Sequence, residues 1–373
     1  MTTQELVRNP YRDHDGNWNF SGTYPTDDVV FLLNPKQIEP TPVAEKEALI
    51  QSGLRHYSEM LAAESLPDER YMQLYETALS SNAARLRHDI EQLAQAIQRR
   101  PKTSESCVVI SLARAGTPIG ILLKRALKRL GIETWHYSIS IIRGRGIDEN
   151  ALDYIAKRHG TGNSIFVDGW TGKGAIRGEL DRSLENSAFA PFLAVVADPA
   201  GRADLAATFD DYVLPSGLLN SIVSGLVSRS VLNDNLVGPN DFHACVYISE
   251  HASDDVSREF IAAIERAGEW VPVSDPWNAS AADQVRAEAD GMIQSIAAEC
   301  GVGDLNRIKP GIAEATRAIL RRVPDRIYVH RRDDPDVAHI CLLADKAGVP
   351  VIERNMRTYR AITIIKNLGG DQQ

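Results

Sequence analysis

The stretch between residues 107 and 214 alternates short apolar runs with helical patterns, and this alternation limits the possible folds more than any other feature. The apolar runs lie at 107–112, 135–142, 165–168, 192–198 and 211–214. Helical spacing separates them at 118–130, 149–159, 174–184 and 202–208, and a further helix is predicted at 218–232. Strands that alternate with helices form parallel sheets covered on both faces. The sequence therefore predicts an α/β fold with a parallel sheet.

The flanking regions follow different patterns. Residues 1–40 read as irregular with one apolar run at 29–33, and helical spacing follows at 44–64 and 83–99. Beyond a predicted strand at 244–248 and helices at 254–267 and 281–300, the end of the chain reads helix, strand, helix, strand, helix. Those elements are predicted at 312–320, 326–330, 337–347, 349–352 and 358–368. We predict a helical preface at 1–100, a main domain at 101–300 and a small αβα domain at 305–373.

Composition excludes several classes of protein. Hydrophobic residues make up 43% and charged residues 24% of the chain, which is typical of soluble globular proteins. No apolar run approaches the roughly 18–20 residues of a membrane span, and the first residues lack a signal-peptide pattern. The cysteines at 107, 245, 300 and 341 form no Cys-x-x-Cys pair, so no zinc site or disulfide framework is indicated. A cytoplasmic protein with no membrane partner is expected.

Charge is distributed unevenly along the chain. Residues 305–373 hold 13 Lys and Arg against 8 Asp and Glu, whereas the first 304 residues hold 28 against 42. A basic tail on an acidic body suggests contact with a polyanion. An ordinary arginine-rich helix surface would give the same balance.

The loop after the third predicted strand has the chemistry of a phosphate-binding loop. Its glycines allow backbone N–H groups to approach an anion, and the following helix adds positive potential. A P-loop is excluded, because Val167 stands where its first glycine belongs and Gly174 where its Ser or Thr belongs. The candidate ligand-binding residues are Asp168, Gly169, Thr171, Gly172, Lys173 and Gly174.

Two further loops have residues suited to anions. The turn after the first predicted strand combines small residues with one arginine; it consists of Ala113, Arg114, Ala115 and Gly116. After the second predicted strand, Arg143 and Arg145 are separated by glycine. Guanidinium groups bind phosphate in a two-pronged way, so all three loops favour a phosphorylated ligand.

These loops, taken together, resemble those of the type I phosphoribosyltransferases over about residues 100–235. The resemblance implies that the Asp168 loop holds the ribose and 5′-phosphate of phosphoribosyl pyrophosphate (PRPP), and that Ala113–Gly116 is the pyrophosphate loop. It further implies catalytic roles for Arg143 and Arg145 on a mobile loop, Mg2+ bound with PRPP, and an N-glycosidic bond made or cleaved with an unidentified base. One departure is Gly169, which replaces the second acid of the family's loop.

The whole chain also resembles one bacterial family. Phe20-Ser-Gly-Thr-Tyr-Pro, the segment around His56-Tyr-Ser-Glu-Met, and Leu219-Asn-Ser-Ile-Val-Ser-Gly are similar to StiP-type proteins of tellurium-resistance and stress gene clusters. That resemblance implies a C-terminal Pelota-type RNA-binding domain. Its RNA contacts would include Arg331, Arg332, Arg354 and Arg357, although Asp333, Asp334 and Asp336 interrupt the basic patch.

Other functions remain open on the sequence. A non-catalytic nucleotide- or RNA-sensing protein would show the same loops. A cysteine hydrolase, a label attached to some StiP-type proteins, has His243-Ala-Cys245 as its best local support. No side-chain pattern indicates a metal site, no general base can be named, and a homodimer is compatible with the sequence.

Overall fold

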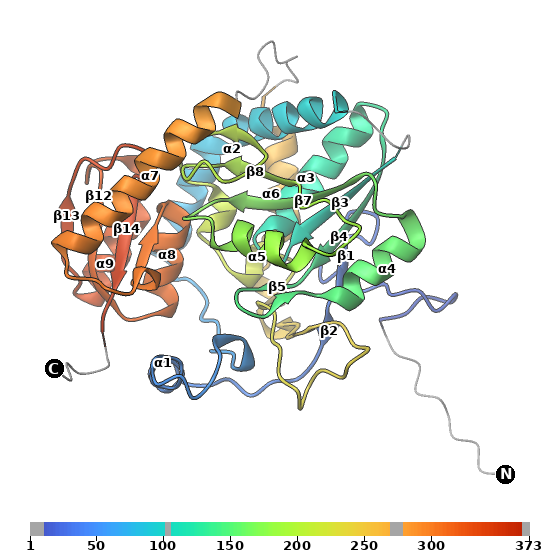
Figure 1. The fold of residues 1–373 in the computed structure, drawn as a ribbon, viewed down its shortest axis with the longest axis horizontal. Coiled ribbons are helices and arrows are strands. Elements are labelled where there is room, and N and C mark those ends of the chain that lie inside the picture. The colour runs from blue at the N-terminus through green and yellow to red at the C-terminus, as the bar shows by residue number, and fades with distance from the viewer. Residues whose placement is uncertain (1–10, 101–105, 269–278, 368–373) are drawn as a thin grey trace.

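The central feature of the fold is a six-stranded sheet in which every neighbouring pair of strands is parallel (Figure 1). A computed structural model describes residues 11–100, 106–268 and 279–367. In sheet order the strands are β1 (Val30–Leu32), β4 (Glu133–Ile139), β3 (Ser106–Leu112), β7 (Ser164–Trp170), β8 (Leu193–Ala197) and β9 (Leu205–Thr208). The α/β class and the parallel sheet predicted from the sequence are confirmed.

Helices and short strands surround this sheet. Three helices pack together on it: α2 (Glu69–Gln98), α3 (Gly116–Arg129) and α6 (Ser257–Arg266). The remaining elements of this part are α1 (Val43–Gln51), α4 (Glu149–His159), α5 (Ala175–Leu184), the hairpin β5 (Ile141–Ile142) with β6 (Gly146–Ile147), and the pair β2 (Asn34–Pro35) with β10 (Ala244–Cys245). Among the described residues, no helix has the length and apolar character that crossing a bilayer demands.

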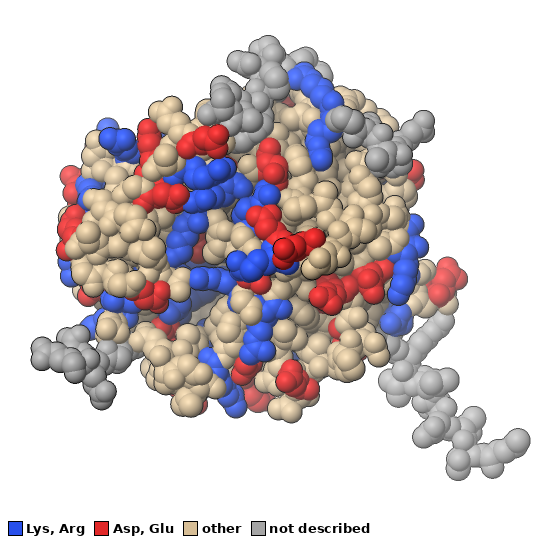
Figure 2. All heavy atoms as spheres, in the orientation of Figure 1, with Lys and Arg blue, Asp and Glu red and all other residues tan. Residues whose placement is uncertain are grey.

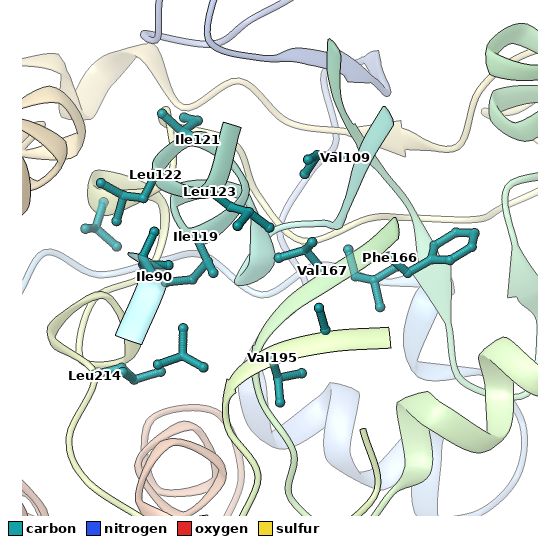
Figure 3. Packing of buried hydrophobic residues seen from close by; sticks show 14 of the residues in the cluster. Ile90, Val109, Ile119, Ile121, Leu122, Leu123, Phe166, Val167, Val195 and Leu214 are labelled. Carbon is teal, nitrogen blue, oxygen red and sulfur yellow. The ribbon is translucent and has the colours of Figure 1, made fainter. Parts of the chain in front are cut away.

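The main core lies between the sheet and the layer formed by α2 and α3. Figure 3 shows Ile90 of α2 and Ile119 of α3 close to Val167 of β7 and Leu214. The central strands are rich in β-branched and aromatic residues, and Val109, Ile110 and Phe166 are fully buried. Such continuous apolar runs are typical of parallel strands covered on both faces.

The C-terminal region forms a second sheet of four strands. Its order is β11 (Ile308–Pro310), β14 (Ala361–Ile365), β12 (Pro324–Val329) and β13 (Val351–Glu353), and only β12 and β13 are parallel. Helices α8 (Ile312–Arg321) and α9 (Ala338–Ala347) pack against each other, and α8 contacts β12 and β14. Helix α7 (Ala279–Glu299) contacts β11, and its Ile293 and Ile296 share a buried cluster with Ile362 and Ile364 of β14.

The main core continues into this C-terminal region. Ile312 and Ala315 of α8 and Ile340 of α9 belong to the same buried cluster as the core of the main sheet. Helix α9 also contacts α2. The two regions are therefore packed together through apolar surface, and Figure 1 shows α8 on the side of the C-terminal sheet that faces the main sheet.

Two predicted helices in the main region are wrong. Residues 202–208 contain strand β9, because backbone pairing with β8 outweighs the helix propensity of Leu205-Ala-Ala. Residues 218–232 contain one short 3-10 turn at 221–223, and another precedes them at 215–217. Gly225 has φ +74°, and a Cβ on it would lie 3.0 Å from the ring of Tyr24, so tertiary packing replaces the helix.

Other local predictions also need correction. Residues 211–214 form no strand, and the apolar run at 29–33 supplies β1, an edge strand of the main sheet. The helix predicted over 44–64 ends at Gln51, just before Gly53 with φ +71°. The final predicted helix at 358–368 is strand β14, and residue 368 lies outside the described residues. Its Ile-Thr-Ile-Ile run favours a strand.

Candidate functional site

A cleft lies where the carboxyl ends of β3 and β7 face the C-terminal region. Its volume is about 370 Å3. The turn after β3, the loop after β7 and the β5–β6 turn line one side, and β11 and α8 line the other. Ligands of open parallel α/β sheets bind outside the carboxyl ends of the strands. This cleft is therefore the candidate functional site.

The loop after β7 lies in the cleft, as the sequence predicts. Thr171, Gly172, Lys173 and Gly174 all line it, and α5 begins directly after Gly174, which has φ +85°. The Thr171 hydroxyl donates to the carboxylate of Asp198 at the end of β8. Thr171 therefore fastens the loop to the sheet and does not present its hydroxyl proton to the cleft.

Lys173 is held at the boundary between the two regions. Its Nζ donates to the carbonyl oxygens of Leu305 and Ile308, at 3.2 Å for Ile308. Burial, together with the nearby cations Lys309 and Arg143, lowers the pKa of Lys173 to about 8. Burial and the neighbouring cations both disfavour the charged form of Lys173, whereas a bound anion would favour it.

Asp168 is half-buried at the end of β7 and lines the cleft. Burial raises its pKa to about 7, although Arg317 and a hydrogen bond of 2.8 Å from the Gly169 backbone N–H act in the opposite direction. Gly169 does not line the cleft. A Cβ there would lie 3.7 Å from Leu214 and 3.9 Å from Ile119, so a second acid at this position would face apolar side chains.

The turn after β3 is built around an ion pair. Ala113, Arg114 and Ala115 line the cleft, but the Arg114 guanidinium pairs with Glu64 at 2.6 Å and donates to the carbonyl of Val227 at 2.8 Å. Gly116 lies outside the cleft, beneath β7. A Cβ on it would lie 2.3 Å from the Val167 carbonyl oxygen, so only glycine allows α3 to begin this close to the strand.

The two arginines of the β5–β6 turn lie in different places. Arg143 lines the cleft and its guanidinium donates to the side-chain oxygen of Asn306. Arg145 is exposed and pairs with Glu59 at 2.8 Å, outside the cleft lining. The Glu179 carboxylate holds the turn by accepting the backbone N–H groups of Gly144 and Gly146 at 2.7 and 3.0 Å.

The cleft is strongly cationic. Eight Lys and Arg side chains and two carboxylates, Asp168 and Glu314, line it. Figure 2 shows Lys and Arg atoms gathered along the boundary between the C-terminal region and the main sheet. Within the described part of the chain, four of the eight cations form no ion pair with a carboxylate; we call them the unpaired cations. They are Arg143, Lys173, Lys309 and Arg321.

Sequence reasoning did not place the C-terminal residues in this site. Lys309, Arg317 and Arg321 lie more than 130 residues beyond the β7 loop and were assigned to a separate domain. Arg317 and Arg321 are four residues apart and so share one face of α8. Arg317 also lies over the ring of Trp170, with its guanidinium carbon 4.5 Å from the ring centroid. The helical spacing was visible in the sequence, but the direction of that face was not.

The cysteines differ in accessibility. Cys107 and Cys245 are buried, and burial raises the pKa of the Cys245 thiol. His243 Nδ1 forms a hydrogen bond of 2.8 Å with the Ser140 hydroxyl. The partner of this ring nitrogen is therefore a hydroxyl and not a thiol. Cys300 and Cys341 are partly exposed, and Cys300 Sγ lies 3.2 Å from the Tyr328 hydroxyl.

The four arginines expected to contact RNA lie in the segments that follow β12 and β13. Arg331 pairs with Asp333 at 2.8 Å, Arg332 donates to the Val351 carbonyl at 2.8 Å, Arg354 pairs with Glu299, and Arg357 lies 4.0 Å from Glu288. Arg331 and Arg357 also line a second cavity of about 440 Å3 with His330 and Thr358. Acidic neighbours thus balance much of this basic surface.

Comparison with known proteins gives two family matches. Residues 22–265 match a family described as "Tellurite-like stress resistance cysteine protease StiP", and residues 287–367 match the PELOTA RNA-binding domain. A curated relative from Acinetobacter baylyi, named "Cysteine protease StiP", is 42% identical over 367 residues. That match covers 94% of this chain and 95% of the relative.

Two solved structures are remote matches. A hypoxanthine phosphoribosyltransferase of Trypanosoma cruzi is 14% identical with a TM-score of 0.27, and the match covers 34% of this chain and 77% of that one. A hypothetical protein from Neisseria gonorrhoeae with bound ppGpp is 15% identical with a TM-score of 0.24, over 32% and 68% of the two chains. Similarity at this level supports no functional argument.

The comparisons correct the expected enzyme class. The family description and the name of the curated relative both specify a cysteine protease, and neither specifies a transferase. The prediction of a phosphoribosyltransferase that makes or cleaves an N-glycosidic bond with PRPP is therefore contradicted. Tellurite-type stress resistance and the Pelota match agree with the resemblance found in the sequence. With one relative matched over nearly its full length and a family match over most of its residues, the chain belongs to the StiP family.

Proposed function

We propose that the cleft binds a small molecule that carries phosphate groups. The observation that supports this most is the set of unpaired cations, Arg143, Lys173, Lys309 and Arg321, which share one cavity without carboxylate partners among the described residues. A volume of about 370 Å3 is within the range of small-molecule sites. The nucleotide-sensing alternative considered from the sequence fits this proposal.

The physical reason is the cost of crowding like charges. Burying a cation is costly unless it is both paired with an opposite charge and hydrogen-bonded. Burial together with Arg322 and Arg143 lowers the pKa of Lys309, and the same kind of crowding acts on Lys173. A phosphate group placed among these side chains would supply the missing negative charge. Charge-assisted hydrogen bonds to phosphate are among the stronger ones in proteins.

The proposed ligand contacts follow from the geometry. On the main-sheet side they are the loop at Gly172–Gly174, the turn at Ala113–Ala115, Arg143 and Asp168. Asp168 and Glu314 are the only carboxylates in the lining, and no cluster of three metal-binding side chains occurs among the described residues. A magnesium ion would therefore be held mainly by the phosphates of the ligand, with Asp168 as a contributing oxygen donor.

A calorimetric titration with inorganic pyrophosphate tests the proposal. We expect saturable binding to the wild type and a loss of about tenfold or more in affinity for Lys173→Met, because one charge-assisted contact is removed. Lys128→Met is the matched control, since Lys128 is exposed on α3 and outside the cleft. No saturable binding to the wild type, or equal losses in both variants, would contradict the proposal.

The affinity for anions should fall as pH rises from about 6 to about 9. The pKa of Asp168 lies near 7 and that of Lys173 near 8, so the free cleft becomes less positive as each loses its proton. A bound anion raises both pKa values, and binding therefore takes up protons. Titration with sulfate, which keeps its charge over this range, measures the trend. Asp168→Asn should remove the part of the decline near pH 7; an unchanged profile in this variant would refute the assignment.

Peptide-bond hydrolysis is a second candidate function, supported by the family description and the name of the relative. A catalytic cysteine must reach substrate and form a thiolate. Burial argues against Cys107 and Cys245, which leaves Cys300 and Cys341 as the candidate nucleophiles.

If the chain is a protease, alteration of a partly exposed cysteine should abolish its activity. We expect hydrolysis of a fluorescent casein substrate to be lost in Cys300→Ser or Cys341→Ser and retained in Cys107→Ala. Activity that survives in the double variant at Cys300 and Cys341 would exclude both as nucleophiles.

RNA binding by the C-terminal domain, residues 305–373, is a further proposal supported by the PELOTA match. Arg331, Arg332, Arg354 and Arg357 are its proposed contacts. A gel-shift assay at increasing salt checks it: phosphate contacts predict that binding weakens with salt, and RNA retention unchanged by Arg331→Gln with Arg332→Gln would rule out those two contacts.

A further inference from the structure

Half of the unpaired cations come from outside the main sheet. Lys309 lies on β11 and Arg321 at the end of α8, whereas Arg143 and Lys173 lie on loops of the main sheet. Arg317, one helical turn before Arg321, also lines the cleft. The C-terminal domain thus directs the cationic face of its helix α8 toward the main sheet.

Arg321 is placed where its charge is not neutralised. It donates to the side-chain oxygen of Asn220, which also accepts from Arg114 at 3.0 Å. The nearby carboxylate of Glu64 is already paired with Arg114 at 2.6 Å. Burial and the repulsion from Arg114 and Arg317 lower the pKa of Arg321. A bound anion would offset the repulsion among the guanidinium groups of Arg114, Arg317 and Arg321.

Lys309, on β11, also lines the cleft without a carboxylate partner among the described residues. In residues 11–100, 106–268 and 279–367 it makes no side-chain hydrogen bond or ion pair, and burial lowers its pKa. Its nearest opposing charges are those of Glu314 and Asp304, and Arg322 and Arg143 act against them. Lys309 and Arg321 therefore both line the cleft without a carboxylate partner among the described residues, and each can bind an anion.

The β7 loop is fastened to the same domain. Lys173 donates to the Ile308 carbonyl at 3.2 Å, and the Tyr359 hydroxyl donates to the Gly172 carbonyl at 2.8 Å. A Cβ on Gly172 would lie 2.9 Å from Cγ of Glu314. The β7 loop and the C-terminal domain are therefore in direct contact.

We propose that the C-terminal domain supplies half of the ligand site, with Lys309 and Arg321 as ligand-binding residues, and that the ligand fastens the two domains together. This inference rests on the proposed function of the cleft. A ligand that contacts both sides binds best when the domains are docked, so its binding must stabilise docking by the same factor. Ligand binding in the cleft thereby stabilises the docked position of the domain that carries the PELOTA match.

Titration of full-length variants with inorganic pyrophosphate tests the inference. We expect Lys309→Met combined with Arg321→Gln to weaken binding by about tenfold to a hundredfold, as the loss of two charge-assisted contacts implies. Arg321→Lys should retain most of the affinity because it keeps the charge. Arg326→Gln is the control, since Arg326 lies on β12 outside the cleft and pairs with its neighbour Asp325.

Hydrogen exchange provides a second readout that does not depend on a variant. In the wild type, pyrophosphate should slow amide exchange in α8 and in the β7 loop together. If the wild type does not bind pyrophosphate, the proposed function itself fails. If the wild type binds but the double variant binds equally well, or protection is confined to the β7 loop, the proposed function stands and the shared site is overturned.

Discussion

Arg114→Met should destabilise the protein by about 3–5 kcal/mol, because it leaves the Glu64 carboxylate buried without its cation. The Arg114 and Glu64 side chains are only 5% and 12% exposed, and their ion pair measures 2.6 Å. The same guanidinium also donates hydrogen bonds to the Val227 carbonyl oxygen and to the side-chain oxygen of Asn220. Denaturant unfolding monitored by circular dichroism measures the loss.

A surface pair provides the comparison for this variant. Arg145→Met breaks an ion pair of similar length with Glu59, but the two side chains are 42% and 26% exposed. Exposed pairs contribute no more than about 1 kcal/mol. Equal losses in the two variants would mean that Arg114 is not a structural residue. A stable Arg114→Met protein with weakened anion binding would instead give Arg114 the ligand-binding role first expected from the sequence.

Asp211→Ala should destabilise the docked C-terminal domain by roughly 2–4 kcal/mol, because two backbone N–H groups lose their acceptor. The Asp211 carboxylate is buried and accepts the N–H of Ile312, at the start of α8, at 3.0 and 3.1 Å. It also accepts the N–H of Arg360 at 2.8 Å. One side chain of the main region thus caps a helix of the C-terminal domain, and its removal should also lower the affinity for pyrophosphate.

The pH dependence of stability gives a second test of Asp211. Burial raises its pKa from 3.8 to about 7, so between these values the folded protein holds a proton that the unfolded chain releases. The free energy of unfolding should therefore fall as pH rises from about 4 to about 7. Asp211→Ala should flatten this decline, and Asp211→Asn, which resembles the protonated carboxyl, should cost less than Asp211→Ala. A steeper decline in Asp211→Ala would show that the sign is wrong.

The sequence predicted the central architecture because local signals agree with the tertiary structure there. Runs such as Val108-Val-Ile and Ile165-Phe-Val are apolar on both faces, and only a buried parallel strand satisfies them. Prediction failed where packing overrides local preference. Leu205-Ala-Ala is a good helix former that pairs as an edge strand, and the 218–232 segment is bent by its contact with Tyr24.

The site was predicted in part. The β7 loop and Arg143 line the cleft as expected, because their positions follow from the ends of strands. Arg145, Gly116 and Gly169 were expected to bind ligand but do not line it. The Arg145 side chain turns to Glu59, and the two glycines lie against buried neighbours. Lys309 and Arg321 were missed because they come from another part of the chain, and no local pattern shows which surface a helix faces.

The residues of the three loops do not identify which reaction the protein catalyses. Glycines, an arginine and a lysine at the ends of strands describe how an anion is held, and such an arrangement suits many chemistries. The transferase prediction took the reaction from a resemblance, and the family match contradicts it. The structure shows a cleft at the ends of these strands whose charged lining residues are mostly cations, and phosphate binding there is our proposal.

The most direct test of that proposal is to locate an anion in the cleft. Crystals grown without sulfate or phosphate and soaked in selenate would show bound selenium by its anomalous scattering. We predict a peak in the cleft within hydrogen-bonding distance of Lys173 and Lys309. Selenate that is found only on other surfaces, with none in the cleft, would contradict the central claim that the unpaired cations form a phosphate-binding site.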